Sequence, residues 1–475
     1  MTTSDTLAFA SIAEVGAQLR AGTVTSAALT DMMLARIAAR DGHFHSYVTV
    51  TADRARAAAA RADADLAAGL DHGPLHGIPV AVKDLCAIAG VPQTGGMAFR
   101  RDAVSPVTAF CVARLDAAGA VILGTLNLTE GAMAGYHRSF AVPVNPWGKT
   151  LWPGGSSSGS GVAVAAGLCF AAIGTDTGGS IRFPALANGV VGLKPSYGRV
   201  SRADVLELAG SLDHIGALAR HVGDAALLVQ AMAGADPADP TSLAGPAPDM
   251  MTGIGGAIAG LRLGVDRRYN ADGTAPEVVA AIEAALARFA AMGATIVDVT
   301  MPADTESMVP VWFALCSHEA VLAHASTWPS SAADYGDYFR DFLSFGSSLD
   351  AASIASARAA RADYNQRFAA VLAGCDALVA PAGGITFEMD IDLYGGMAAT
   401  SARFNHVRMV HTVPADFAGT PSLTLPCGVS DDGRPVALQL MGAAGAEALL
   451  CRIGQAFEQN ADWCRAYEGL PANRA

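Results

Sequence analysis

The stretch WPGGSSSGSG, residues 152–161, guides the interpretation of the whole chain, although its composition is that of a flexible linker. Eight of its ten residues are Gly or Ser, as in tethers between domains. A tether would be flanked by hinge-like polar segments. Here Asn-Pro-Trp at 145–147 precedes the stretch, and residues that predict a helix and then a strand follow it. We therefore interpret the stretch as part of a folded site.

Two phosphate-binding motifs share features with this stretch, but neither matches it. A phosphate-binding loop has the pattern G-x-x-x-x-G-K-[ST], in which the lysine reaches the phosphates. Gly154 and Gly159 have that spacing, but Ser160 occupies the lysine position. A dinucleotide-binding loop fails as well, because residues 162–164 offer no third Gly or Ala at the required place. Both phosphate interpretations are disfavoured.

Short apolar segments alternate with helical patterns on both sides of this stretch. The first seventy residues are predicted to be helical. Residues 77–82 and 120–123 are predicted strands, with a predicted helix at 108–118 between them. Helices that alternate with short buried strands indicate an α/β fold.

The composition is that of a folded protein with a large core. Hydrophobic residues make up 52% of the 475 residues, and charged residues only 16%, against a usual share of roughly 25%. We expect a single domain over residues 1–475, with a helical segment at about 1–70. The Pro- and Gly-rich segment at about 234–260 is expected to be a long surface loop, because the α/β alternation resumes after it.

Charge, cysteine usage and targeting signals restrict the partners and the location. A net charge of −13 argues against nucleic acid, whose phosphates require clustered Lys and Arg. The N-terminus lacks the basic region of a signal peptide, and no run reaches the ~18 apolar residues of a membrane helix. The eight cysteines form no C-x-x-C pair and no cluster with zinc spacing. We expect a cytoplasmic protein with reduced thiols, no metal and no membrane partner.

Three residues are candidates for nucleophilic catalysis. Ser180 follows two glycines, which let the backbone turn tightly and point successive N–H groups into one cavity, where they could bind an oxyanion. Lys83 ends an apolar segment, so desolvation could lower its pKa and make it a base. Ser156 is the third candidate. The alternatives are an ordinary turn at Ser180 and a surface ion pair between Lys83 and Asp84, and spacing alone does not bring the three residues together.

Three segments together closely resemble the motifs of the amidase signature family. They are GIPVAVKD at 77–84, PGGSSSGS at 153–160 and GTDTGGSIRFP at 174–184. Further family-like landmarks occur at 124–130, 191–200, 211–216 and 419–426, so the likeness extends from about residue 8 to 468. It implies the amidase signature fold, in which helices cover both faces of a large, mostly parallel or mixed β-sheet.

The resemblance also implies a Ser–cis-Ser–Lys triad. Ser180 would be the nucleophile, Ser156 would relay its proton, and Lys83 would be the general base. No metal or organic cofactor is implied. His76 and His214 lie within family-like segments but are expected to be hydrogen-bonded scaffold residues.

Other site residues follow from the same resemblance. Backbone N–H groups of Thr177, Gly178 and Gly179, together with that of Ser180, would form the oxyanion hole. Ser157 and Asp176 would hold the loops of the site. Arg182 could be either a substrate contact or an ion-pair partner, and we favour the structural role.

The substrate class follows less directly. The chain shares several segments with the A subunit of glutamyl-tRNA amidotransferase, but DFLSFGSS at 341–348 departs from the stretch that carries glutamine recognition there. We expect a hydrolase of small aryl or apolar amides, anilides, carbamates (urethanes) or esters that acts through an acyl-enzyme. The amidotransferase component remains the alternative, a catalytically inactive binding protein is disfavoured, and a homodimer is a family-based expectation. The candidate pocket residues, which could equally belong to the core, are Met133, Tyr136, Trp312, Phe313 and Phe342.

Overall fold

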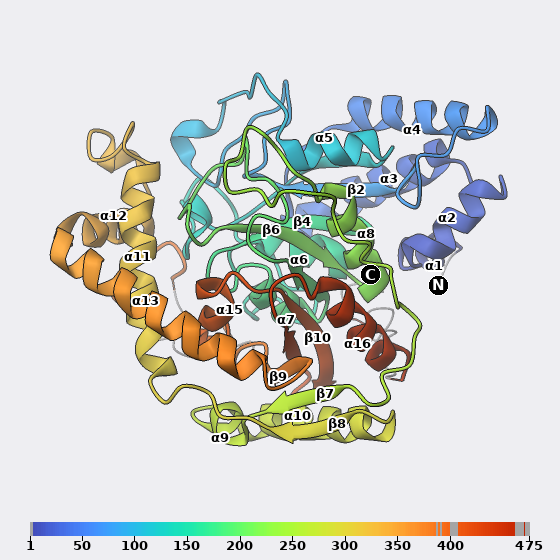
Figure 1. Cartoon of the computed structure of the whole chain (residues 1–475). Coiled ribbons are helices and arrows are strands. Elements are labelled where there is room, and N and C mark those ends of the chain that lie inside the picture. The colour runs from blue at the N-terminus through green and yellow to red at the C-terminus, as the bar shows by residue number, and fades with distance from the viewer. Residues whose placement is uncertain (1–2, 386–387, 390–391, 400–406, 461–469, 471–475) are drawn as a thin grey trace.

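The computed structural model describes residues 3–385, 388–389, 392–399, 407–460 and 470. Its centre is an 11-stranded sheet with the strand order β1-β3-β2-β4-β6-β5-β10-β11-β9-β7-β8 (Figure 1). The strands are β1 Tyr47–Val50, β2 Pro79–Lys83, β3 Val121–Leu126, β4 Ala171–Asp176, β5 Val191–Lys194, β6 His214–Ala219, β7 Arg262–Val265, β8 Thr295–Asp298, β9 Ala377–Pro381, β10 Ser422–Val429 and β11 Pro435–Met441.

The expected α/β fold with a large mixed sheet is confirmed. Parallel pairing is restricted to β3–β2–β4 near one end and β9–β7–β8 at the other. The other six of the ten strand pairs are antiparallel, so of the two expected alternatives the sheet is mixed and not mostly parallel.

Helices precede, connect and follow these strands. They are α1 Thr3–Ala8, α2 Ile12–Arg20, α3 Ser26–Phe44, α4 Ala52–Ala67, α5 Phe110–Ala117, α6 Ser158–Ala165, α7 Arg182–Asn188, α8 Val222–Met232, α9 Arg267–Ala271, α10 Pro276–Ala291, α11 Met308–Ala323, α12 Asp337–Ser348, α13 Ala351–Leu372, α15 Val413–Phe417 and α16 Glu447–Gln459. Within the described ranges, no helix combines the length and the apolar character needed to cross a bilayer.

Both faces of the sheet are covered, as expected. Leu193 in β5 pairs with Leu423 in β10, so both side chains point to one face, while the adjacent Gly192 faces the other side. Leu423 lies against Gly454 of α16, whereas a Cβ on Gly192 would lie 2.8 Å from the Cβ of Ala185 in α7. Helices α16 and α7 therefore cover opposite faces.

The N-terminal region contains a strand as well as helices. Between α3 and α4, β1 pairs with the edge of β3. Residues 233–261, which connect α8 to β7, contain no helix or strand. Helix α11 packs against both α12 and α13 at one side of the molecule, in the yellow-to-orange part of Figure 1.

The topology explains where the candidate residues meet. Strands β2 and β4 are parallel neighbours, with Val80 paired to Ala171. The carboxyl ends of parallel strands lie at the same edge of a sheet. Lys83, the last residue of β2, therefore lies beside the end of β4, where the segment 177–181 begins.

Candidate active site

Lys83 is buried and surrounded by hydroxyl groups. Its Nζ lies within hydrogen-bond distance of Ser156 Oγ at 2.7 Å, Ser157 Oγ at 2.9 Å and Thr175 Oγ1 at 2.8 Å. The side chain is 0% exposed, and this burial lowers the pKa of Lys83 from 10.5 to about 7. A large fraction of the amine is therefore neutral near pH 7 and can accept a proton. The contact between Lys83 and Ser156 is the one that spacing could not establish.

The Gly/Ser stretch at 152–161 is buried throughout, which confirms that it is not a tether. Its Gly155–Ser156 peptide bond is cis. Gly154 has φ +79°, and a Cβ there would lie 2.4 Å from the Cα of Pro184, so the chain fits at this point only as glycine. The stretch continues into α6, whose first residue is Ser158.

The serines of this stretch bond to three different parts of the site. Ser157 N–H donates to the carbonyl of Ser180 at 3.2 Å, and its Oγ accepts from the N–H of Thr175 at 3.2 Å. Ser160 Oγ donates to the carbonyl of Ile173 at 2.9 Å, and Ser158 Oγ accepts from the hydroxyl of Tyr136 at 2.8 Å. Ser157 therefore connects Lys83 to the loop that carries Ser180.

The loop after β4 offers backbone N–H groups to a cavity. Thr177, Gly178 and Ser180 line this cavity, and within the described residues their N–H groups have no hydrogen-bond acceptor. Gly179 differs from the sequence expectation. Its N–H donates to Asp176 Oδ1 at 2.6 Å, so it is not free to bind an oxyanion. The available donors are those of Thr177, Gly178 and Ser180.

The carbonyl groups of this loop are held by three side chains. His214 Nδ1 lies 3.2 Å from the carbonyl of Asp176, the indole N–H of Trp312 donates to the carbonyl of Thr177 at 2.8 Å, and Thr412 Oγ1 donates to that of Gly178 at 2.7 Å. In a trans peptide the C=O and the following N–H point in opposite directions. His214 and Trp312 therefore orient the N–H groups of Thr177 and Gly178.

His214 is a scaffold residue, as expected. Burial lowers its pKa well below the ordinary value, so the ring is neutral. Its Nδ1 lies 2.6 Å from the carbonyl of Leu212, which places the proton on Nδ1.

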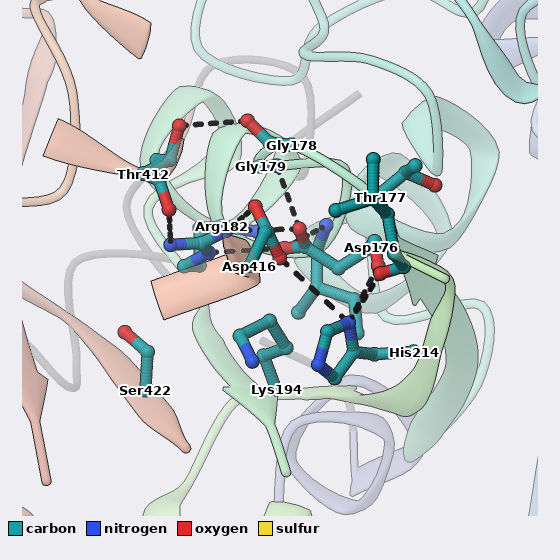
Figure 2. Close-up of polar contacts among 12 residues, drawn as sticks. Asp176, Thr177, Gly178, Gly179, Arg182, Lys194, His214, Thr412, Asp416 and Ser422 are labelled. Carbon is teal, nitrogen blue, oxygen red and sulfur yellow. Dashed lines mark hydrogen bonds and ion pairs between the residues drawn. The ribbon is translucent and has the colours of Figure 1, made fainter. Parts of the chain in front are cut away.

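A buried ionic network lies beneath the loop (Figure 2). Arg182 donates to Asp176 Oδ1 at 2.9 Å, to Asp416 Oδ2 at 2.6 Å and to the carbonyl of Thr412 at 2.8 Å. All three charged side chains are 0% exposed. Arg182 therefore has the ion-pair environment that we favoured over substrate contact.

The two carboxyl groups of this network differ in pKa. Burial alone would raise the pKa of Asp176, but the adjacent Arg182 holds it well below its usual range. Burial raises the pKa of Asp416 to about 8 despite the same arginine. One carboxylate therefore balances the guanidinium, which avoids an uncompensated negative charge in the interior.

The cavity next to Ser180 has a volume of about 620 Å³, within the range typical of small-molecule sites. Its walls are largely apolar, and Met133, Trp312 and Phe313 line it. Tyr136 and Phe342 are not among its lining residues. Tyr136 is buried and its hydroxyl is directed to Ser158, while Phe342 is buried behind Phe313, with ring centroids 5.1 Å apart.

Three residues of the site were missed in the sequence analysis. Thr175 is the third hydroxyl partner of Lys83, and Thr412 and Asp416 support the loop. Thr175 lies inside a motif that we quoted, between Gly174 and Asp176. Thr412 and Asp416 immediately precede the landmark at 419–426, and that proximity was the available signal.

One group of side chains outside the cavity has the composition of a metal site. The ligand atoms of Asp65, His72 and His76 lie within 4.8 Å of one another. The backbone N–H of His72, however, donates to Nδ1 of His76 at 3.1 Å. Neutral His76 therefore carries its proton on Nε2, the nitrogen that lies 4.0 Å from Asp65, and offers no free lone pair there. We interpret the group as hydrogen-bonded scaffold.

Comparison with known proteins now identifies the family. The family model described as Amidase matches residues 28–451. This chain belongs to the amidase family. It is 39% identical over 462 residues to the protein named "Putative amidase AmiD" from Mycobacterium tuberculosis (strain ATCC 25618 / H37Rv), covering 96% of this chain and 95% of that protein. The resemblance to amidase signature enzymes is confirmed.

Other members of the amidase family differ in their described activities. The chain is 38% identical over 478 residues to the A subunit of the glutamyl-tRNA(Gln) amidotransferase from Synechococcus sp. (strain WH7803), covering 95% of this chain and 97% of that protein. The solved structure of a peptide amidase from Stenotrophomonas maltophilia superimposes with a TM-score of 0.83 at 32% identity, covering 95% of this chain and 96% of that one. Family membership therefore leaves the substrate open.

Proposed function

We propose that this amidase-family enzyme is a serine hydrolase that cleaves C–N bonds of small, aryl or otherwise apolar amides. The observation that carries the proposal is the buried contact between Lys83 and Ser156. Lys83 has a pKa near 7 and is bonded to Ser156, whose neighbour in the chain, Gly155, lines the same cavity as Ser180. Lys83 therefore has the chemistry of a neutral base.

In the first half of the proposed reaction, Ser180 Oγ attacks the amide carbonyl carbon. Its proton passes to Ser156, whose own proton passes to neutral Lys83. The N–H groups of Thr177, Gly178 and Ser180 stabilise the oxyanion. When the tetrahedral intermediate collapses, the C–N bond breaks, and the proton returns from Lys83 through Ser156 to the leaving amine.

In the second half, water hydrolyses the acyl-enzyme. Neutral Lys83 accepts the proton of the attacking water through Ser156, and the same N–H groups stabilise the second oxyanion. Collapse of this intermediate breaks the bond between the acyl carbon and Ser180 Oγ, and the proton returns from Lys83 through Ser156 to Ser180 Oγ. The products are a carboxylic acid and an amine, and the enzyme returns to its starting protonation state.

The cavity supports the substrate class. Apolar side chains such as Met133, Val309 and Phe313 form much of its wall, and burying an aryl ring against them is favourable by ~25 cal/mol per Å². Anilides therefore lead the proposal. Carbamates and esters present the same carbonyl with another leaving group, so we include them as substrates of the same site.

A transamidase component is the second candidate, and the 38% identity to the amidotransferase protein favours it. The two candidates differ in what the isolated chain can do. A free-standing hydrolase turns over aryl amides without partners. A transamidase component on its own is expected to be a poor amidase on model anilides and to use glutamine as its amide donor.

The test is an assay of the purified chain on matched anilides, primary amides, carbamates, esters and glutamine. We expect turnover of anilides, lowered at least about 1000-fold in Ser180→Ala. Ser160→Ala is the matched control, because it removes a buried hydroxyl of the Gly/Ser stretch whose one bond to the described residues goes to the Ile173 carbonyl. Equal rates for wild type and Ser180→Ala would refute the hydrolase proposal, and glutamine as the sole substrate would favour the transamidase.

A further inference from the structure

Two charged residues lie in the wall of the otherwise largely apolar cavity. Among its described lining residues, only Glu306 and Arg408 carry full charges. Glu306 belongs to the short 3-10 helix Thr305–Ser307 before α11, and Arg408 directly precedes the 3-10 helix Met409–His411. Segments about 100 residues apart therefore bring opposite charges to one site.

Arg408 is less exposed to solvent than Glu306, and it has an N–H group without an acceptor among the described residues. Its side chain is 18% exposed, against 71% for Glu306, and Nη1 lies 3.4 Å from Glu306 Oε1. Nη2 donates to the carbonyl of Asp272 at 2.6 Å, while Nε is buried without an acceptor in the described part of the chain. A guanidinium has five N–H donors, and within the described residues Arg408 uses two of them.

The exposed glutamate compensates this charge only weakly. An ion pair with a well-solvated partner contributes little, because water competes for both charges. An anion held against Arg408 by an apolar wall would be partly desolvated, and hydrogen bonds between charged groups are then stronger. Because the chain carries a net charge of −13, a local cation is needed to draw an anion into the cavity.

We propose that Arg408 makes the enzyme selective for amides that carry a carboxylate at the end remote from the scissile bond. The inference rests on the proposed function for the location of the scissile bond, and it deepens that function by naming a substrate class. The apolar wall holds the body of the substrate, and the planar guanidinium pairs with its carboxylate in place of Glu306. Arg408 is a specificity residue in this account and takes no part in proton transfer.

Binding to Ser180→Ala protein tests the inference without requiring turnover. The ligands are aryl amides with a carboxylate on either the acyl or the amine side, each paired with its neutral methyl isostere. Calorimetric titration is expected to show tighter binding of at least one carboxylate ligand, and about a 10- to 100-fold loss of that binding in Ser180→Ala/Arg408→Met. Binding of the neutral isostere is expected to change less than threefold.

The control substitutions separate a local effect from net charge and from backbone effects. Arg408 has φ 55°, a conformation that penalises any residue with a Cβ, so methionine retains this backbone cost. Arg56→Met removes the same charge from an exposed pair with Asp31, outside the cavity, and is expected to leave binding of both ligand classes unchanged. Glu306→Gln is expected to strengthen carboxylate binding, because it removes a competing anion.

Two results would overturn the inference. Equal losses for carboxylate and neutral ligands in Arg408→Met would show that the arginine only supports the cavity wall. Equal binding of the two classes to the protein with Arg408 intact, or no detectable binding of either, would show that there is no carboxylate selectivity. Kinetics on the wild type then separate the two claims, since turnover of neutral anilides supports the hydrolase even if Arg408 has no such role.

Discussion

Titration of Lys83 is expected to control both activity and stability. Burial places its pKa at about 7 in the folded protein, against 10.5 for an unperturbed lysine. At about 1.4 kcal/mol per pH unit, this difference corresponds to about 5 kcal/mol. The folded state therefore disfavours the charged form of Lys83 by that amount relative to the unfolded chain.

The sign of the pH dependence follows from proton binding. Between pH 7 and 10.5 the unfolded chain keeps its proton on Lys83 while the folded protein has lost it, so the free energy of unfolding rises with pH in that window. The stability that this titration adds to the folded protein is fully present above pH 10.5 and fully lost below about pH 7. Lys83→Met has no titrating amine at this position. The difference in unfolding free energy between wild type and Lys83→Met should therefore change by about 1.4 kcal/mol per pH unit between pH 7 and 10.5.

Two measurements check this reasoning. Denaturant unfolding of wild type and Lys83→Met at pH 6, 7, 8 and 9 should give a difference that is constant below pH 7 and changes in favour of wild type above it. The kcat/KM of wild type on a neutral anilide should rise with pH through a midpoint near 7, since only neutral Lys83 accepts the proton. Parallel stability curves, or a rate that rises only near pH 10, would contradict the assignment of Lys83 as a desolvated base.

Three further substitutions test the support of the oxyanion loop. Thr412→Val removes the donor to the Gly178 carbonyl, and we expect kcat to fall about tenfold with KM nearly unchanged, as steady-state kinetics would show. Gly178→Ala would place a Cβ 2.5 Å from the buried indole of Trp312, and a loss of about 100-fold or more in kcat/KM is expected in the same assay. Asp416→Ala removes a buried acceptor of Arg182 while Asp176 still balances its charge, and denaturant unfolding should show a loss of about 1–3 kcal/mol. Wild-type values in any one of these variants would remove the role assigned to that side chain.

Local features of the site were predictable from the sequence. The glycines of the Gly/Ser stretch indicated a tight backbone, and an apolar strand that ends at Lys83 indicated a desolvated amine, with a surface ion pair to Asp84 as the alternative. These inferences depend on neighbours in the sequence, and the family resemblance supplied the contact between Lys83 and Ser156.

Long-range geometry was not predictable from spacing. Strand β5 pairs with β10, where Lys194 meets Ser422, and no local pattern specifies this pairing across more than 200 residues. Phe313 lines the cavity, whereas Phe342 lies behind it. The face that a helical residue presents to a cavity depends on how the helices dock, so both aromatics were equal candidates.

The sequence also did not reveal that the Gly179 N–H bonds to Asp176, because this contact depends on long-range geometry as well. The Gly-Gly-Ser motif indicates successive N–H groups but not which of them meet internal acceptors. The carboxylate of Asp176 folds back onto the loop and accepts from Gly179 and Ile181, a geometry that depends on Arg182 holding the same carboxylate. Asp416, the second carboxyl group bonded to Arg182, lies 234 residues beyond Arg182 in the sequence.

The loop that we propose to bind the oxyanion is held by elements from the whole fold. His214 comes from β6, Trp312 from α11, and Thr412 from the residue before α15, and each fixes one carbonyl of the loop. Donors that are already oriented cost no reorganisation when charge develops on the substrate. Trp312 also lines the cavity, so the docking of α11 both shapes the binding surface and directs the Gly178 N–H. The proposed mechanism therefore couples substrate fit to transition-state stabilisation through Trp312, and it predicts that changes in the packing of α11 alter kcat as well as KM.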